Sequence, residues 1–141
     1  MSLVMKAGDY YIGDLCYVMH GEWQDVCNLL FEGRDDHGCN EGTFNLPDGR
    51  AFALFNTAYG DGYYSDNKGK EYPVDAGSIG CIRVEDIREN SGDKDTMPND
   101  KTLGNIYSFE NDFEVYSDGR VLTFGDVEID TDPYADDYDE D

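Results

Sequence analysis

The sequence predicts an α+β protein in which β structure predominates, with one or two twisted antiparallel sheets packed on one main helix. Two observations support this class. A single segment has apolar residues at helical spacing, and several short β-prone runs are separated by turn signals such as Asp-Gly. We expect about seven to eight short strands, most of them joined as hairpins. A chain of 141 residues fits one domain with one hydrophobic core.

Two short β-prone runs come first, at residues 9–19, and surround the pair Gly13-Asp14. A helix is predicted next, at about residues 22–32. Its apolar residues recur at i, i+3, i+4, i+7 and i+8, which gives one hydrophobic face. They are Trp23, Val26, Cys27, Leu30 and Phe31. Gly33 is expected to end the helix in a left-handed conformation, and the inner face of the sheet is expected to hold it.

Strands follow the helix, and we expect three hairpins among them. Their turns are Pro47-Asp48-Gly49, Asp66-Asn67-Lys68-Gly69 and Asp118-Gly119. Residues 78–84 add a further strand, and residues 91–102 read as a polar loop without periodicity. The folded domain is predicted to span residues 5–131. Residues 1–4 are interpreted as a leader in front of a natural start at Met5, and residues 132–141 as an acidic, disordered tail that contributes little to folding.

The net charge of −22 limits the choice of partners. There are 32 acidic residues against 10 basic ones, and only nine of the acids lie in residues 126–141, so the body of the chain is acidic as well. A field of this sign repels nucleic acid phosphates and anionic lipid headgroups. We therefore expect no direct binding to nucleic acid or membranes, and a basic protein is the expected partner.

No stretch approaches the roughly 18 consecutive apolar residues of a membrane-spanning helix, and the N-terminus lacks the pattern of a signal peptide. The sequence therefore predicts a cytoplasmic protein. Its four cysteines are expected to be reduced and buried rather than paired in disulfides.

The dipeptide Gly-Asp occurs five times in the chain. Aspartate is common in turns because its carboxylate accepts backbone N–H bonds, so a structural role is the simpler interpretation. The alternative is that Asp14, Asp61 and Asp75 converge at one end of the sheet and bind Ca²⁺ or Mg²⁺, since hard cations require several oxygen ligands.

The segment Gly60-Asp61-Gly62 follows an apolar strand and precedes two tyrosines, so Asp61, Tyr63 and Tyr64 are candidate binding residues. We expect the Asp61 carboxylate to accept N–H bonds within its own turn. On that basis Asp61→Asn is expected to destabilise the protein.

Other chemical motifs are weak. The residues with soft metal ligands are Cys16, His20, Cys27, His37 and Cys39. No C-x-x-C pair supports a zinc site among them, and no phosphate-binding glycine motif or nucleophile signature occurs. The sequence therefore favours a protein that is not an enzyme.

Several segments resemble a group of small uncharacterised proteins from bacteria and their phages, which share a Y-x-G-D-x-C-Y opening and a G-D-G-x-Y segment. The matching residues are Gly13, Asp14, Cys16, Tyr17, Gly60, Asp61, Gly62, Tyr63, Asp75, Gly77 and Gly80. The resemblance covers most of residues 9–131, and it implies no activity.

These observations together predict a small acidic accessory protein that binds a basic protein, and the resemblance points to a phage origin. A sharper version of the hypothesis is a nucleic acid mimic, whose carboxylates take the place of phosphates. The alternative is a divalent-metal-binding module or a metal-dependent hydrolase that uses aspartates at one sheet end.

Overall fold

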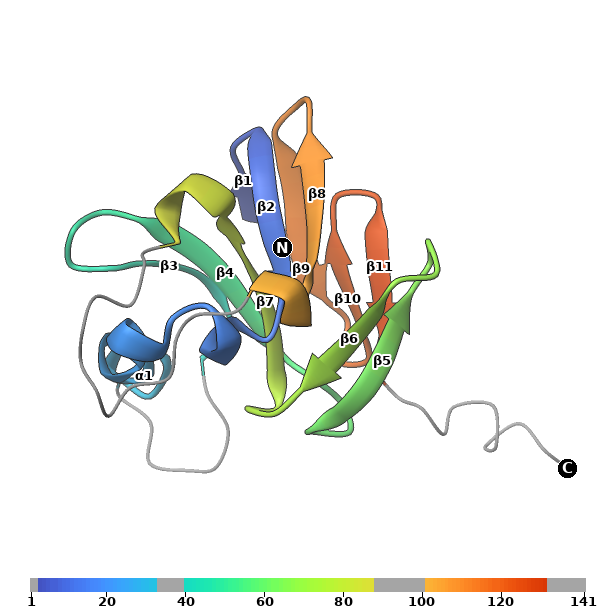
Figure 1. Cartoon of the computed structure of the whole chain (residues 1–141), viewed down its shortest axis with the longest axis horizontal. Coiled ribbons are helices and arrows are strands. Elements are labelled where there is room, and N and C mark those ends of the chain that lie inside the picture. The colour runs from blue at the N-terminus through green and yellow to red at the C-terminus, as the bar shows by residue number, and fades with distance from the viewer. Residues whose placement is uncertain (1–2, 33–39, 88–100, 132–141) are drawn as a thin grey trace, which may run out of the picture.

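The computed structural model describes residues 3–32, 40–87 and 101–131 (Figure 1). This part of the chain contains 11 strands in two antiparallel sheets and one α-helix, α1 (Trp23–Leu30). The predicted α+β class with predominant β structure is confirmed. More strands form than the predicted seven to eight, because short segments such as β1 (Leu3–Met5) and β11 (Val127–Asp130) also pair.

The first sheet has six strands in the order β1-β9-β10-β11-β5-β6, and the second has five in the order β3-β4-β7-β2-β8. The remaining strands of the first sheet are β5 (Gly62–Asp66), β6 (Glu71–Val74), β9 (Phe113–Ser117) and β10 (Val121–Phe124). The second sheet is built from β2 (Gly8–Gly13), β3 (Gly42–Asn45), β4 (Ala51–Asn56), β7 (Ser78–Arg83) and β8 (Asn105–Phe109). Four 3-10 turns complete the elements: η1 (Leu15–Tyr17), η2 (His20–Glu22), η3 (Val84–Asp86) and η4 (Lys101–Leu103).

The three predicted hairpins are confirmed by the pairing of β3 with β4, β5 with β6 and β9 with β10. The start of the domain needs correction. Leu3 and Val4 were placed in a leader, but they pair with Val115 and Glu114 of β9. The tail at residues 132–141 lies outside the described residues, as does Gly33.

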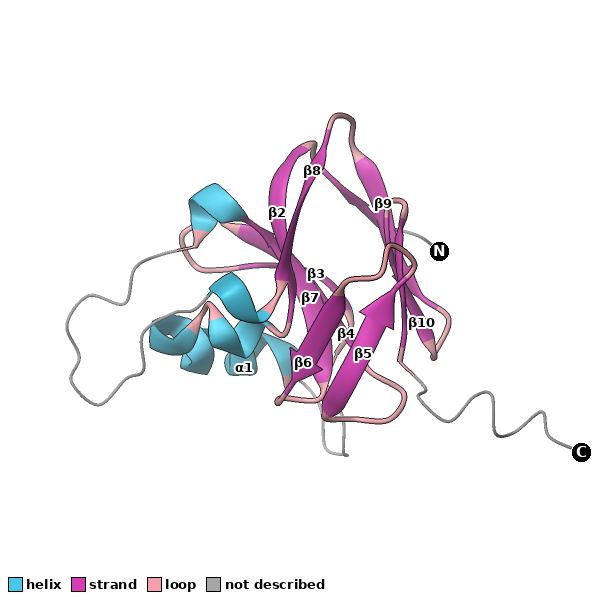
Figure 2. Cartoon of the chain, turned by 45° about the vertical axis from the view of Figure 1, so that its right-hand side comes forward, coloured by secondary structure: helices cyan, strands magenta, loops and turns pink. Residues whose placement is uncertain are grey.

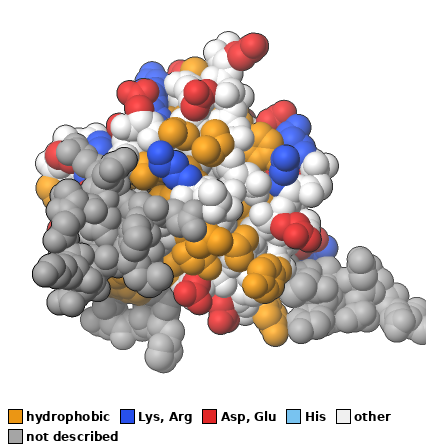
Figure 3. Space-filling view, viewed as in Figure 1, with side chains coloured by type: hydrophobic (Ala, Val, Ile, Leu, Met, Phe, Trp, Pro, Cys, Tyr) orange, Lys and Arg blue, Asp and Glu red, His pale blue; other side chains and the backbone are white. Residues whose placement is uncertain are grey.

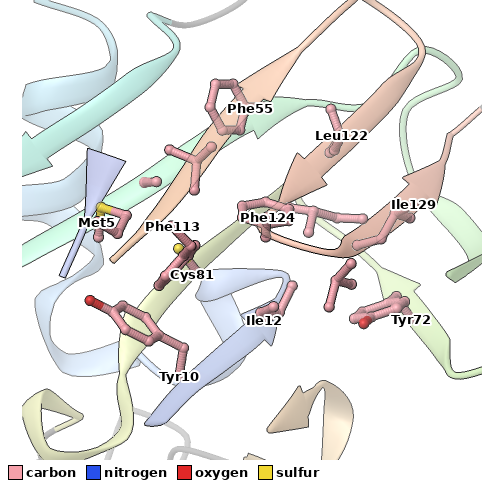
Figure 4. Packing of buried hydrophobic residues seen from close by; sticks show 14 of the residues in the cluster. Met5, Tyr10, Ile12, Phe55, Tyr72, Cys81, Phe113, Leu122, Phe124 and Ile129 are labelled. Carbon is pink, nitrogen blue, oxygen red and sulfur yellow. The ribbon is translucent and has the colours of Figure 1, made fainter. Parts of the chain in front are cut away.

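The main core lies between the two sheets, which face each other (Figure 2). Side chains from both sheets meet there (Figure 4): the rings of Tyr10 and Phe113 lie 4.9 Å apart, and those of Phe55 and Phe124 lie 6.0 Å apart. Both pairs are edge-to-face, the arrangement that the quadrupoles of aromatic rings favour.

A second core fills the outer face of the five-stranded sheet. There Val26 and Leu30 of α1 pack in one cluster with Leu15, Phe52 and Leu54. The helix was expected on the inner face of the sheet, and this expectation is wrong, because the six-stranded sheet occupies that face. Strand β4 is consequently buried on both faces and reads as the unbroken apolar run AFALF.

The guanidinium of Arg50 holds the helical side of the molecule together. Its Nε donates to Asp48 at 2.8 Å, its Nη1 donates to the backbone oxygen of Asp86 at 2.8 Å, and both Nη atoms contact the carboxylate of Glu22. These bonds join the β3–β4 turn, η3 and the residue that precedes α1. No helix in the described ranges is long and apolar enough to cross a membrane.

Candidate functional site

Two loops and η1 meet at one end of the two-sheet structure, at the lower edge in Figure 1. The loop at residues 57–61 joins β4 to β5, and the turn at residues 75–77 joins β6 to β7. The backbone N–H of Thr57 donates to the carbonyl of Gly77 at 3.1 Å, so the two loops are bonded to each other. The predicted candidates Asp14, Asp61 and Asp75 all lie in this region.

Asp14 is fully buried, and its carboxylate is occupied by backbone donors. Oδ1 accepts the N–H of Cys16 at 3.0 Å. Oδ2 accepts the N–H groups of Asp75 and Ala76 at 2.7 and 2.6 Å. A buried carboxyl group is costly unless hydrogen bonds satisfy it, and these three bonds offset the cost of burying Asp14. Asp14 therefore anchors η1 to the β6–β7 turn.

The turn around Asp61 is held by Thr57 rather than by Asp61. The hydroxyl of Thr57 donates to the carbonyl of Gly60 at 2.6 Å and accepts the N–H of Gly60 at 2.9 Å. Gly60 has φ +108°, a conformation that residues with a Cβ rarely adopt. Asp61 itself is exposed, and its carboxylate accepts no hydrogen bond from the described residues. The expectation that Asp61 caps its own turn is therefore wrong.

The two tyrosines of the predicted binding segment point in opposite directions, as neighbours on a strand must. Tyr63 is 79% exposed. Tyr64 is 3% exposed, and its hydroxyl donates to the carbonyl of Gly60 at 2.6 Å. Tyr64 therefore supports the loop from the core, while Tyr63 and Asp61 face solvent.

Two further tyrosines at this end were missed as binding candidates. Tyr59 is 53% exposed and lies in the same loop as Asp61. Tyr17 of η1 is half-buried; its burial, followed by the nearby carboxylates of Asp14 and Asp75, raises its pKa to about 12. No local signal identified Tyr59, because a large residue before a turn glycine can lie on the surface or in the core: Phe124, directly before Gly125, is fully buried.

We define the aromatic-acidic surface as Tyr17, Tyr59, Asp61, Tyr63 and Asp75. Figure 3 shows hydrophobic and acidic side chains side by side along the lower edge, over the β4–β5 and β6–β7 loops. The surface thus combines exposed rings with carboxylates on loops that hydrogen bonds hold in place.

The arrangement gives no support to a metal centre. Within residues 3–32, 40–87 and 101–131, no group of three or more His, Cys, Asp or Glu side chains is placed to hold an ion. The oxygens of Asp14 already accept backbone N–H bonds, so of the three candidate aspartates only the exposed Asp61 and Asp75 could offer carboxylate oxygens to an ion. Ca²⁺ requires six to eight oxygen ligands. For zinc, the residues His37 and Cys39 lie outside the described ranges.

The described cysteines Cys16, Cys27 and Cys81 are free thiols. Burial raises the pKa of each, and the carboxylate of Asp14 raises that of Cys16 further. Because the thiolate is the nucleophile, these thiols are poorly suited to covalent catalysis at neutral pH.

Searches against protein-family models, curated proteins and solved structures gave no significant match to this chain. The resemblance to the bacterial and phage group therefore stays a prediction. The fold and the surface define a two-sheet β protein with one covering helix and an exposed aromatic-acidic end.

Proposed function

We propose that this protein is a non-enzymatic accessory protein that binds a basic segment of another protein through the aromatic-acidic surface. The observation that carries the proposal is the 79% exposure of Tyr63 at the start of β5, beside the loops that carry the exposed carboxylates of Asp61 and Asp75. Aromatic residues are enriched at the centres of protein interfaces, where they bury a large area at little entropic cost.

The chemistry of the surface suits arginine or lysine side chains. A cation above the face of Tyr59 or Tyr63 is attracted by the ring quadrupole, while Asp61 or Asp75 accepts its N–H donors. The net charge of −22 attracts such a partner from a distance and speeds association.

The loops are also held in one conformation before binding. Thr57 closes the loop that carries Tyr59 and Asp61, and Asp14 fixes the turn that carries Asp75. A surface that is already ordered loses less conformational entropy when a partner binds. A narrower form of the proposal is nucleic acid mimicry by a phage-derived protein, in which the basic segment belongs to a DNA-binding groove.

The test measures binding of a fluorescently labelled oligoarginine peptide by anisotropy, at low and at high salt. We expect Tyr63→Ala to weaken binding about three- to fivefold, because an exposed cation–π contact is lost. Tyr116→Ala is the matched control, since Tyr116 is exposed on β9 outside the surface. Equal affinity of Tyr63→Ala and Tyr116→Ala for the peptide, with binding that falls as salt rises, would show attraction by net charge alone and would overturn the proposed site. A low-salt pull-down that recovers only neutral or acidic proteins would contradict the proposed binding of a basic partner.

A further inference from the structure

A hollow of about 430 Å³ lies at the opposite end of β7 from the aromatic-acidic surface. Strand β7 begins at Ser78, next to the β6–β7 turn, and ends at Arg83, which lines the hollow. Six residues of strand separate the two ends by roughly 16 Å. The hollow is bordered by β1, the β3–β4 turn and η3, so it is a site separate from the proposed protein-binding surface.

Arg83 lines the hollow, and its guanidinium is hydrogen-bonded only to uncharged oxygens of the described residues. Its Nε donates to the hydroxyl of Tyr10 at 3.4 Å and its Nη2 donates to the carbonyl of Ala7 at 2.9 Å. Both acceptors are uncharged, and among the described residues no carboxylate lies within ion-pair distance of Arg83. The guanidinium is therefore held in one orientation, with Nη1 donors available for a ligand.

The other cations of the hollow differ from Arg83 in this respect. Arg50 is neutralised by Glu22 and Asp48, and the exposed Lys6 lies 3.7 Å from Asp112. Val4, Met5 and Ala51 add apolar surface to the walls. The hollow thus offers one oriented guanidinium beside an apolar wall.

We propose that this hollow binds a small organic monocarboxylate with an apolar body, the carboxylate pairing with Arg83 and the body lying against Met5 and Ala51. The planar guanidinium fork matches the two oxygens of a carboxylate. Asp48 and Asp86 also line the hollow, and they repel a dianion such as phosphate more strongly than a monoanion. The carboxylates of Glu85 and Asp86 act on Arg83 only from beyond ion-pair distance, so a bound carboxylate would be its one direct ionic partner among the described residues, and a neutral ligand would not make this pair.

The test is a titration of ¹⁵N-labelled protein with sodium benzoate, followed by NMR. We expect saturable shifts of the Arg83 side-chain Nε–H signal and of the backbone amides of residues 5–7. Benzyl alcohol, which has the same ring without the charge, and inorganic phosphate serve as comparison ligands. Both should bind at least about tenfold more weakly, as expected for loss of a charge-assisted pair or for repulsion of a dianion.

Two variants distinguish a direct contact between Arg83 and benzoate from the general effect of removing one positive charge. Arg83→Gln should weaken benzoate binding about tenfold or more, while Arg120→Gln, which removes an exposed cation elsewhere, should leave it unchanged. Circular dichroism checks that Arg83→Gln stays folded, and the wild-type comparison of benzoate with benzyl alcohol tests the proposal without any variant. Equal binding of benzyl alcohol, benzoate shifts that do not saturate, or shifts confined to other parts of the chain would each overturn it.

Discussion

The hydroxyl of Tyr107 on β8 donates to Oδ2 of Asp66 on β5 at 2.6 Å, a bond that joins the two sheets. Tyr72 on β6 donates to the same oxygen at 2.6 Å, and Oδ1 accepts the N–H groups of Lys68 and Lys70. One carboxylate therefore closes the β5–β6 hairpin and ties it to the edge of the opposite sheet.

Stability is expected to fall in acid because of this carboxylate. Burial raises the pKa of Asp66, but the hydrogen bonds from Tyr107, Tyr72, Lys70 and Lys68 outweigh it and leave the pKa below its ordinary value of 3.8. A pKa that is lower in the folded state than in the unfolded chain stabilises the fold above 3.8. This stability is lost as the pH falls through the folded pKa, which urea denaturation over an acid pH series will show.

The variant Tyr107→Phe tests whether the hydrogen bond to the Asp66 carboxylate stabilises the fold. It removes one hydrogen bond to the carboxylate and should cost about 1–2 kcal/mol at neutral pH. The cost should shrink in acid, where Asp66 is protonated in both proteins. Tyr116→Phe is the control, because that hydroxyl lies on an exposed ring. A cost for Tyr107→Phe that does not change with pH would contradict a role through the charge of Asp66.

The turn at residues 57–61 should depend on Thr57 and not on Asp61. Thr57→Val keeps the shape of the side chain but removes both hydrogen bonds to Gly60, and we expect a loss of about 1–2 kcal/mol in the free energy of unfolding. Asp61→Asn should leave the melting temperature unchanged or slightly higher, since it relieves repulsion in an acidic protein. A clear fall for Asp61→Asn would restore the capping role expected from the sequence.

Asp14→Asn should be the most damaging of the single aspartate changes at this end. The amide that replaces Oδ1 or Oδ2 cannot accept, so one or two of the backbone N–H groups of Cys16, Asp75 and Ala76 lose their partner in the core. We expect a cost of about 2–3 kcal/mol. Asp75→Asn is the matched control, because only the backbone of Asp75 takes part. Equal melting temperatures for the two variants would remove the anchoring role of Asp14.

Local patterns in the sequence predicted local structure well. The spacing of Trp23, Val26 and Leu30 indicated the helix, and the turn residues indicated three hairpins. The pattern could not reveal that Asp14 binds backbone groups 61 and 62 residues away, because such contacts depend on how the strands pair. Strand alternation also predicts that one of Tyr63 and Tyr64 is exposed, but the register decides which.

The thiol of Cys16 provides a chemical probe of the aromatic-acidic surface. Burial is the main cause of its raised pKa, followed by Asp14, and the carboxylate of Asp75 adds to it. Asp75→Asn removes that charge and keeps the backbone N–H that Asp14 accepts. We therefore expect a lower pKa for Cys16 and alkylation by iodoacetamide about two- to threefold faster at neutral pH.

Cys27 is an internal control for this measurement, because its pKa is raised by burial alone. Mass spectrometry of digested protein gives both rates from one reaction. In Asp75→Asn the rate at Cys16 should rise while the rate at Cys27 stays constant. A parallel rise at both cysteines would indicate general loosening of the fold. No change at either one would show that the Asp75 carboxylate does not act on this surface, and it would weaken the case for Asp75 as a contact for a basic partner.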